Sequence, residues 1–109
     1  MKQILWTALV TPFNNDNSID YVSLQKCLHL QEFYGNGIVL FGSTGEGLSL
    51  TEEEKRKILI FVCNLQLKTK IIVCVPSYNL FIAEEWLKFC NDYPIDGYLM
   101  TIAKFIILS

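Results

Sequence analysis

Hydrophobic runs alternate with amphipathic stretches along this chain at nearly regular spacing. Short runs of Ile, Val, Leu and Phe that are apolar throughout are typical of strands buried on both faces. They predict strands at residues 4–10, 38–41, 71–75 and 98–101. Between them, apolar residues recur three and four positions apart, which predicts helices at about 20–34, 51–65 and 80–92.

The predicted helices carry start and stop signals. Thr51 and Glu54 form a capping box at the start of the second helix. The glycines at 35 and 37 end the first helix, and the polar cluster at 14–17 predicts a turn before it. The residues expected to be buried on the three helices are Leu24, Cys27 and Leu28; Ile58, Phe61, Val62 and Leu65; and Ile82, Trp86, Phe89 and Cys90.

The predicted order of elements is β-α-β-α-β-α-β, which places the chain in the α/β class. Strands without polar alternation favour a parallel sheet covered on both faces. Right-handed crossovers leave an open doubly wound sheet or a (β/α)8 TIM barrel, of which four parallel strands and three helices make the N-terminal half. In either fold, chemistry collects at the carboxyl ends of the strands, here residues 7–12, 42–47, 76–79 and 101.

Composition narrows the class of protein. Of 109 residues, 51% are hydrophobic and 18% are charged, which predicts apolar faces that expect a partner. No apolar run approaches the length of a membrane-spanning helix and no secretory cleavage site is present, so we expect a cytoplasmic protein that does not bind membranes. A net charge of −2 without a basic face argues against nucleic-acid binding.

The four cysteines lie far apart, without a C-x-x-C pair. With no secretory signal, they are expected to be reduced core residues instead of a disulfide framework or a zinc site, and no metal site is predicted. They are Cys27, Cys63, Cys74 and Cys90.

A glycine-rich loop, GSTGEG at residues 42–47, follows the second predicted strand. It lacks the lysine of a phosphate-binding P-loop, and its glycine order differs from the dinucleotide-binding fingerprint. A serine-nucleophile elbow would need glycine where Phe41 stands, and the one histidine, His29, lies inside the first helix. Phosphate binding and serine hydrolase chemistry are therefore not favoured.

Two interpretations of this loop stay open from its residues alone. Successive backbone N–H groups in a glycine-rich turn can bind an anion, and the hydroxyls of Ser43 and Thr44 can donate to a carboxylate or relay a proton. Such a loop suits a small α-keto acid. The alternative is a tight turn whose glycines only permit unusual backbone angles and close packing.

TALVTPF (7–13), FGSTGEGLSLTEEE (41–54), IIVCV (71–75) and AEEWLKFCNDYPIDGYLMT (83–101) together resemble the dihydrodipicolinate synthase and N-acetylneuraminate lyase family, with the synthase branch nearer. The resemblance implies a longer (β/α)8 barrel, usually a homotetramer. It also implies that a lysine on the sixth strand forms a Schiff base with pyruvate. The enamine then attacks aspartate semialdehyde to give 4-hydroxy-tetrahydrodipicolinate, in lysine and diaminopimelate biosynthesis.

The resemblance also implies roles for individual residues. Ser43 occupies the position at which the family has the loop hydroxyl of its proton relay. Thr44 occupies the position at which the family binds the pyruvate carboxylate. The supporting loop residues are Gly42, Gly45 and Glu46, and no cofactor besides the covalently bound pyruvate is implied.

Lysine feedback and the end of the chain bear on activity. Glu84 matches an acidic residue used in feedback by some members, but Leu80 replaces their asparagine, so feedback is not expected. The family pattern stops after Thr101, giving a partial barrel at 1–101 and an aberrant tail at 102–109. The relay tyrosine and the Schiff-base lysine are absent, and Lys104 is interpreted as a chance lysine in that tail.

We therefore expect a product truncated by a frameshift or premature stop, inactive alone and prone to self-association or aggregation. Two alternatives stay open. One is a non-catalytic remnant or interaction fragment, and the other is a neuraminate-lyase-like aldolase of the same family.

Overall fold

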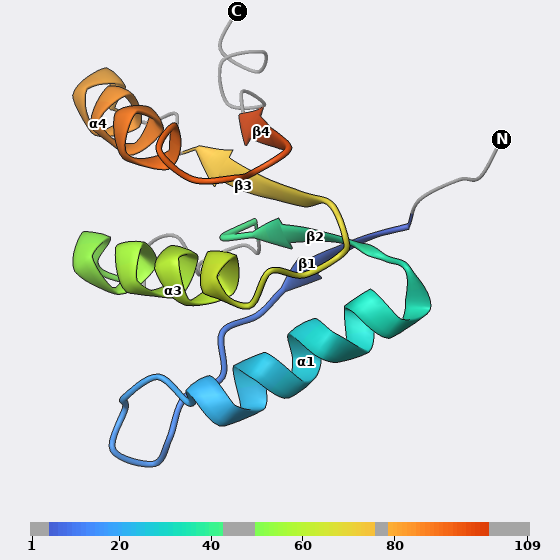
Figure 1. The fold of residues 1–109 in the computed structure, drawn as a ribbon. Helices are drawn as coiled ribbons and strands as arrows, with labels where there is room; N and C mark the ends of the chain where they lie inside the picture. Colours follow the sequence, from blue (N-terminus) through green and yellow to red (C-terminus); the bar gives the residue numbers. More distant parts are fainter. Residues whose placement is uncertain (1–4, 43–49, 76–78, 101–109) are drawn as a thin grey trace, which may run out of the picture.

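The computed structural model describes residues 5–42, 50–75 and 79–100 of the chain (Figure 1). Strands and helices alternate over these residues, as the hydrophobic pattern predicts. The strands are β1 (Trp6–Leu9), β2 (Gly37–Leu40), β3 (Ile71–Val75) and β4 (Gly97–Met100). The helices are α1 (Tyr21–Tyr34), α3 (Glu52–Asn64) and α4 (Leu80–Cys90).

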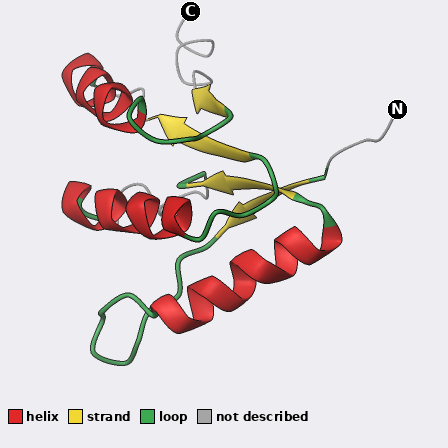
Figure 2. Ribbon diagram, in the orientation of Figure 1, coloured by secondary structure: helices red, strands yellow, loops and turns green. Residues whose placement is uncertain are grey.

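The four strands form one sheet in the order β1-β2-β3-β4, and every neighbouring pair is parallel. One row of paired residues crosses the whole sheet, from Ala8 through Val39 and Ile72 to Gly97. The colouring of Figure 2 shows each strand connected to the next through a helix. The predicted α/β class, with four parallel strands and three helices, is therefore confirmed.

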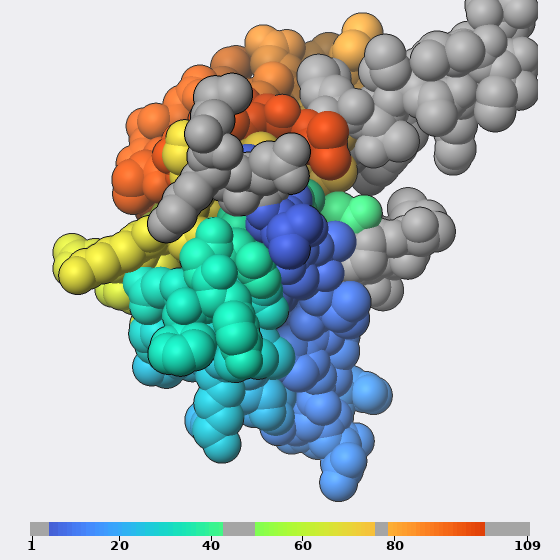
Figure 3. All heavy atoms as spheres, turned by 90° about the vertical axis from the view of Figure 1, so that its right-hand side faces the viewer, coloured from blue at the N-terminus to red at the C-terminus, as the bar shows by residue number. Residues whose placement is uncertain are grey.

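The three helices lie on the same side of the sheet (Figure 1). The core fills the space between them, where apolar burial is the main favourable term in folding. Its fully buried members come from all three helices and the two central strands: Leu24, Leu28, Ile38, Ile58, Leu59, Val62, Val73, Val75, Trp86 and Cys90. In the sphere view of Figure 3, β4 (red) lies above the blue residues of the N-terminal segment.

Local capping explains where the helices begin and end. The carboxylate of Asp20 accepts a hydrogen bond from the Ser23 backbone N–H at 3.0 Å and starts α1. Gly35 ends that helix in the left-handed conformation, with φ of 71°. At the start of α3 the predicted capping box is present: Glu54 N–H donates to Thr51 Oγ1 at 3.1 Å, and Thr51 N–H donates to Glu54 Oε1 at 2.9 Å.

Some predicted burial is wrong. Cys27 is exposed, because α1 turns Leu24 and Leu28 to the sheet and carries apolar residues on its outer side as well. Only Cys90 of the four cysteines is buried; Cys63 and Cys74 are half-buried, and none of the four forms a disulfide bond. Four more residues that were expected to be buried are only half-buried: Phe61, Leu65, Ile82 and Phe89.

The sheet also departs from the prediction that both its faces are covered. The face opposite the helices keeps Trp6 43% exposed and Leu99 49% exposed. No described element packs against that face.

Among the described residues, none of the helices is both long and apolar enough to cross a membrane.

Candidate functional site

Because all four strands are parallel, their carboxyl ends meet at one edge of the sheet, where α/β proteins place their sites. Residues 76–78 and 101–109 directly follow β3 and β4, and residues 43–49 follow β2 after two intervening residues; all three segments lie outside the described residues. The predicted site residues Ser43, Thr44, Gly45 and Glu46 belong to them. Gly42, the first residue of the loop, is described.

The backbone turns sharply where β2 ends. Phe41 has φ of +63°, the left-handed region that bulky side chains rarely adopt. A β-carbon placed on the next residue, Gly42, would lie 2.9 Å from Val39 Cγ1, which is closer than real contacts allow. The chain therefore folds back over Val39 on the face away from the helices, and any larger residue at position 42 would require Val39 to shift.

Described residues on both sides of residues 43–49 are packed in the core. Phe41 is 7% exposed, and its ring packs edge-on against Trp86 of α4 with 5.6 Å between ring centroids. Leu50, just before the cap of α3, is 5% exposed. A bulky residue held at positive φ requires firm support, and such positions concentrate at functional sites. Phe41 and Leu50 are thus both held in the core.

Residues at the end of β1 divide between the two faces. Thr7, expected at the site edge, instead turns toward the helices, where its Oγ1 donates to Gln31 Oε1 of α1 at 3.0 Å. Thr11, beyond the strand, is 6% exposed. The carbonyl of Pro12 accepts from the Asp20 N–H at 2.9 Å, which ties this segment to the start of α1. Thr11 and Pro12 are thus held near the end of the strand, while the side chain of Thr7 points toward the helices.

Lys55 is a buried lysine that the sequence pattern does not reveal. Its side chain is 4% exposed, and its Nζ lies 3.3 Å from Glu52 Oε1 and 5.9 Å from the centroid of the Trp86 ring. The residue lies on α3, in the helix layer. None of the described strands contains a lysine. The described residues therefore place no amine where it could meet a keto acid in front of the sheet.

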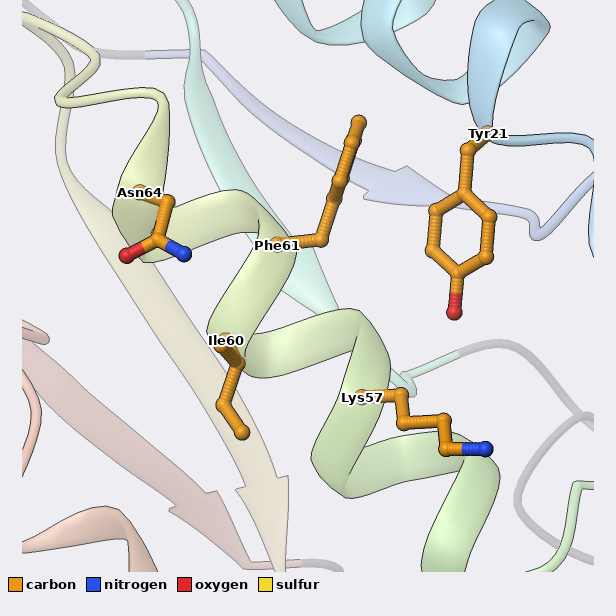
Figure 4. Close-up of a pocket in the computed structure, with 5 residues that line it drawn as sticks. All are labelled: Tyr21, Lys57, Ile60, Phe61 and Asn64. Carbon is orange, nitrogen blue, oxygen red and sulfur yellow. The ribbon is translucent and has the colours of Figure 1, made fainter.

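A hollow of about 490 Å³ lies between the start of α1 and the outer side of α3, lined by Tyr21, Lys57, Ile60, Phe61 and Asn64 (Figure 4). The rings of Tyr21 and Phe61 pack with 4.8 Å between centroids. Its cation, Lys57, already pairs with Glu53 at 3.2 Å. The mostly apolar lining does not suit a small keto acid.

Two cysteines of the helix layer are poor candidates for catalysis, because their thiols stay protonated. Burial raises the pKa of the Cys90 thiol to about 12, and burial also raises the pKa of Cys63. A thiol that stays protonated is a poor nucleophile. Within the described ranges, no cluster of three or more His, Cys, Asp or Glu side chains could hold a metal ion.

Comparison with known proteins gives consistent results. A family model described as "Dihydrodipicolinate synthetase family" matches residues 1–103. The 4-hydroxy-tetrahydrodipicolinate synthase of Wolbachia pipientis wMel is 60% identical over 98 residues, covering 89% of this chain and 33% of that protein. The Chlamydia felis protein of the same name is 52% identical over 97 residues, again covering 89% and 33%. The chain thus spans about a third of the length of these relatives.

Solved structures share the fold. The dihydrodipicolinate synthase of Aquifex aeolicus superposes with a TM-score of 0.81 at 27% identity, covering 91% of this chain and 34% of that one. The N-acetylneuraminate lyase of Proteus mirabilis gives a TM-score of 0.79 at 22% identity, with 89% and 34% covered. The four strands and three helices therefore match the corresponding third of (β/α)8 barrel proteins.

Proposed function

The chain belongs to the dihydrodipicolinate synthetase family, and we propose that it supplies the pyruvate-binding part of a lyase that condenses pyruvate with aspartate semialdehyde. The product would be 4-hydroxy-tetrahydrodipicolinate, on the route to diaminopimelate and lysine. The observation that carries the proposal is the end of β2. There, Phe41 at positive φ and Gly42 above Val39 start the glycine-rich loop at the carboxyl edge of a parallel sheet.

Two loop residues are proposed to act on the keto acid. Thr44 would hold the pyruvate carboxylate through its backbone N–H and hydroxyl, because a glycine-rich turn gathers N–H donors into an anion site. Ser43 would relay protons as a lysine amine adds to the pyruvate carbonyl and water leaves. The enamine formed by loss of a methyl proton would then attack the aldehyde carbon. The amine must come from outside the described strands, which carry no lysine.

The choice of second substrate rests on the curated relatives. Those that are 60% and 52% identical are named 4-hydroxy-tetrahydrodipicolinate synthase. The Proteus neuraminate lyase at 22% identity supports the fold alone. This difference in identity favours aspartate semialdehyde over a sugar-derived aldehyde. We propose that this chemistry takes place in the cytoplasm, where cysteines such as these four stay reduced.

We further propose that residues 1–109 alone do not turn over substrate. The test is reductive trapping: the chain is incubated with pyruvate and borohydride, alone and mixed with the C-terminal two thirds of the Wolbachia relative, and each polypeptide is then weighed. We expect no pyruvyl adduct on this chain, and an adduct on a lysine of the added piece. A pyruvyl adduct on the lone chain would overturn the proposed inactivity.

Substitutions at Ser43 and Thr44, assayed in the mixture with the C-terminal piece, test the two proposed roles separately. Ser43→Ala should lower the rate of condensation, and Thr44→Val should raise the pyruvate concentration needed. Ser18→Ala, in the turn before α1, is the matched control and should change neither. If Ser43→Ala and Thr44→Val behave like Ser18→Ala, the loop is only a tight turn and the proposed function of this site is wrong.

A further inference from the structure

The side chain of Phe41 points to the opposite side from the one that strand alternation predicts. Successive side chains of a strand point to opposite faces of the sheet. Leu40 belongs to the core on the helix side, so an extended residue 41 would point to the other face, together with Val39. Phe41 instead has φ of +63°, and its ring lies in the helix-side core. The left-handed turn therefore brings this ring to the helices.

The indole of Trp86 receives that ring. The two rings pack edge-on with 5.6 Å between their centroids, and Trp86 is 1% exposed. A bulky residue at positive φ persists only where its surroundings hold it there. Edge-on contact between aromatic rings adds to the free energy gained by burying them. We therefore regard the indole as the group that stabilises the left-handed turn at Phe41.

Trp86 is itself held in one orientation by several contacts. Its Nε1–H donates to the carbonyl of Cys74 at 3.3 Å, one residue before the end of β3. The Nζ of Lys55 lies 5.9 Å from the centroid of the indole, and the ring of Phe89 stacks on it at 5.7 Å. Trp86 thus contacts the carboxyl ends of two neighbouring strands, β2 and β3, at the edge where the proposed site lies.

We propose that Trp86 is a positioning residue for the keto-acid site: it holds Phe41 in the left-handed turn and so fixes the direction in which the backbone leaves β2. The inference rests on the proposed function, because it requires a carboxylate bound by backbone N–H groups after Gly42. Such groups turn only with the chain, whereas a side-chain hydroxyl rotates by itself. Disturbing the turn should therefore weaken pyruvate binding more than it slows condensation at saturating pyruvate.

Two substitutions of Trp86 test this split. The rate of condensation is measured against pyruvate concentration in the mixture with the C-terminal two thirds of the Wolbachia relative. Trp86→Leu should raise the pyruvate concentration for half-maximal rate by about tenfold, since a displacement of about 1 Å can cost up to ~100-fold. Trp86→Phe keeps a ring for Phe41 and loses only the N–H donor, so its half-maximal concentration should stay close to that of the parent.

Phe89→Leu is the matched control for stability. Phe89 packs against Trp86, and its other ring contact is with Tyr93 at 5.0 Å between centroids. Its truncation should lower the melting temperature, as the truncation in Trp86→Leu does. The pyruvate concentration for half-maximal rate should nevertheless stay at the parent value. Equal increases of that concentration in Phe89→Leu and Trp86→Leu would overturn the inference, because a general loss of stability would explain both.

A double-mutant cycle tests whether Trp86 acts through Phe41. Phe41→Leu removes the same ring contact from the other side, so it should raise the half-maximal pyruvate concentration by a similar factor. Adding Trp86→Leu to it should then have little further effect. Fully additive effects would overturn the inference. Circular dichroism checks that each variant is folded, and if Trp86→Leu is unfolded, Phe41→Leu decides.

Thr44→Val separates failure of this inference from failure of the proposed function. If Thr44→Val raises the pyruvate concentration needed but Trp86→Leu and Phe41→Leu do not, the inference is overturned and the proposed function stands. If Thr44→Val changes nothing, or the parent mixture forms no adduct, the proposed function is wrong and the inference falls with it.

Discussion

The ammonium of Lys55 lies 5.9 Å from the centroid of the Trp86 ring, and this contact joins α3 to α4. The lysine is 4% exposed, so its methylene stem is packed, while Glu52 Oε1 lies 3.3 Å from the Nζ. Trp86 also packs against Phe41, and its indole N–H donates to the Cys74 carbonyl at 3.3 Å. One tryptophan therefore connects a buried lysine, a strand and the start of the glycine-rich loop.

Replacement of Lys55 should separate the roles of its stem and its charge. Lys55→Ala removes both packing and the cation–π contact, and should lower the free energy of unfolding by about 2 kcal/mol. Lys55→Met keeps the stem and should cost less than about 1 kcal/mol, since Glu52 is half exposed and stays solvated. Urea unfolding at one fixed protein concentration measures both. Equal losses in the two variants would show that the charge dominates.

The hydrophobic pattern predicts the fold class and every described element, because apolar runs and helical spacing reflect burial directly. The same pattern fails at Cys27, since α1 is apolar on both its inner and outer sides and spacing alone does not choose between them. It also predicts that Trp6 and Leu99 are buried, because it treats the strands as covered on both faces; they are 43% and 49% exposed, and no described helix packs over them.

The site is predicted less completely than the fold. Glycine at position 42 signals a tight turn, but nothing in an apolar run identifies Phe41 as the residue with positive φ. Burial of Lys55 is equally hidden, since a long charged side chain on a helix usually reaches solvent. The roles of Ser43 and Thr44, and the tetramer implied by the family resemblance, stay predictions.

Glu32 should make stability depend on pH. Its carboxylate accepts from the Lys68 backbone N–H at 2.5 Å, and this bond lowers its pKa below the ordinary 4.5. The bond therefore stabilises the fold above about pH 4.5, and its contribution is lost as the pH falls through the lowered native pKa. Glu32→Gln should be less stable than the parent at pH 7, with the difference disappearing in acid.

Thermal melts across that pH range provide the measurement for Glu32. Glu53→Gln is the control, since Glu53 is 79% exposed and pairs with Lys57 of its own helix. A difference between Glu32→Gln and the parent that persists unchanged in acid would show that the carboxylate does not act through its charge.

The cysteines should differ in their rates of alkylation. Cys27 is exposed, whereas Cys90 is buried and burial raises its pKa to about 12, so its thiol stays almost entirely protonated at pH 8. Iodoacetamide should modify Cys27 first and Cys90 last, as followed by peptide mass mapping over time. Cys27→Ser should remove the fast phase, and urea should expose Cys90. Equal rates at Cys27 and Cys90 in the native chain would contradict this packing.

Gly37 should be sensitive to the smallest enlargement, because the Trp6 indole occupies the space of its missing β-carbon. Gly37→Ala should cost about 1 kcal/mol, at the low end for overpacking, since a half-exposed indole can move aside. Gly97→Ala is the matched control: its β-carbon would meet Ile72 Cγ1 at an ordinary 3.8 Å. We therefore expect Gly97→Ala to be tolerated.

The pair Trp6 and Gly37 can be isolated in a double-mutant cycle. Trp6→Ala should remove most of the penalty of Gly37→Ala, because the clash needs both side chains. The emission of Trp6 adds a second signal: Gly37→Ala should shift it to the red as the indole leaves the sheet for water. If the two substitutions are additive and the emission is unchanged, the indole does not rest on Gly37.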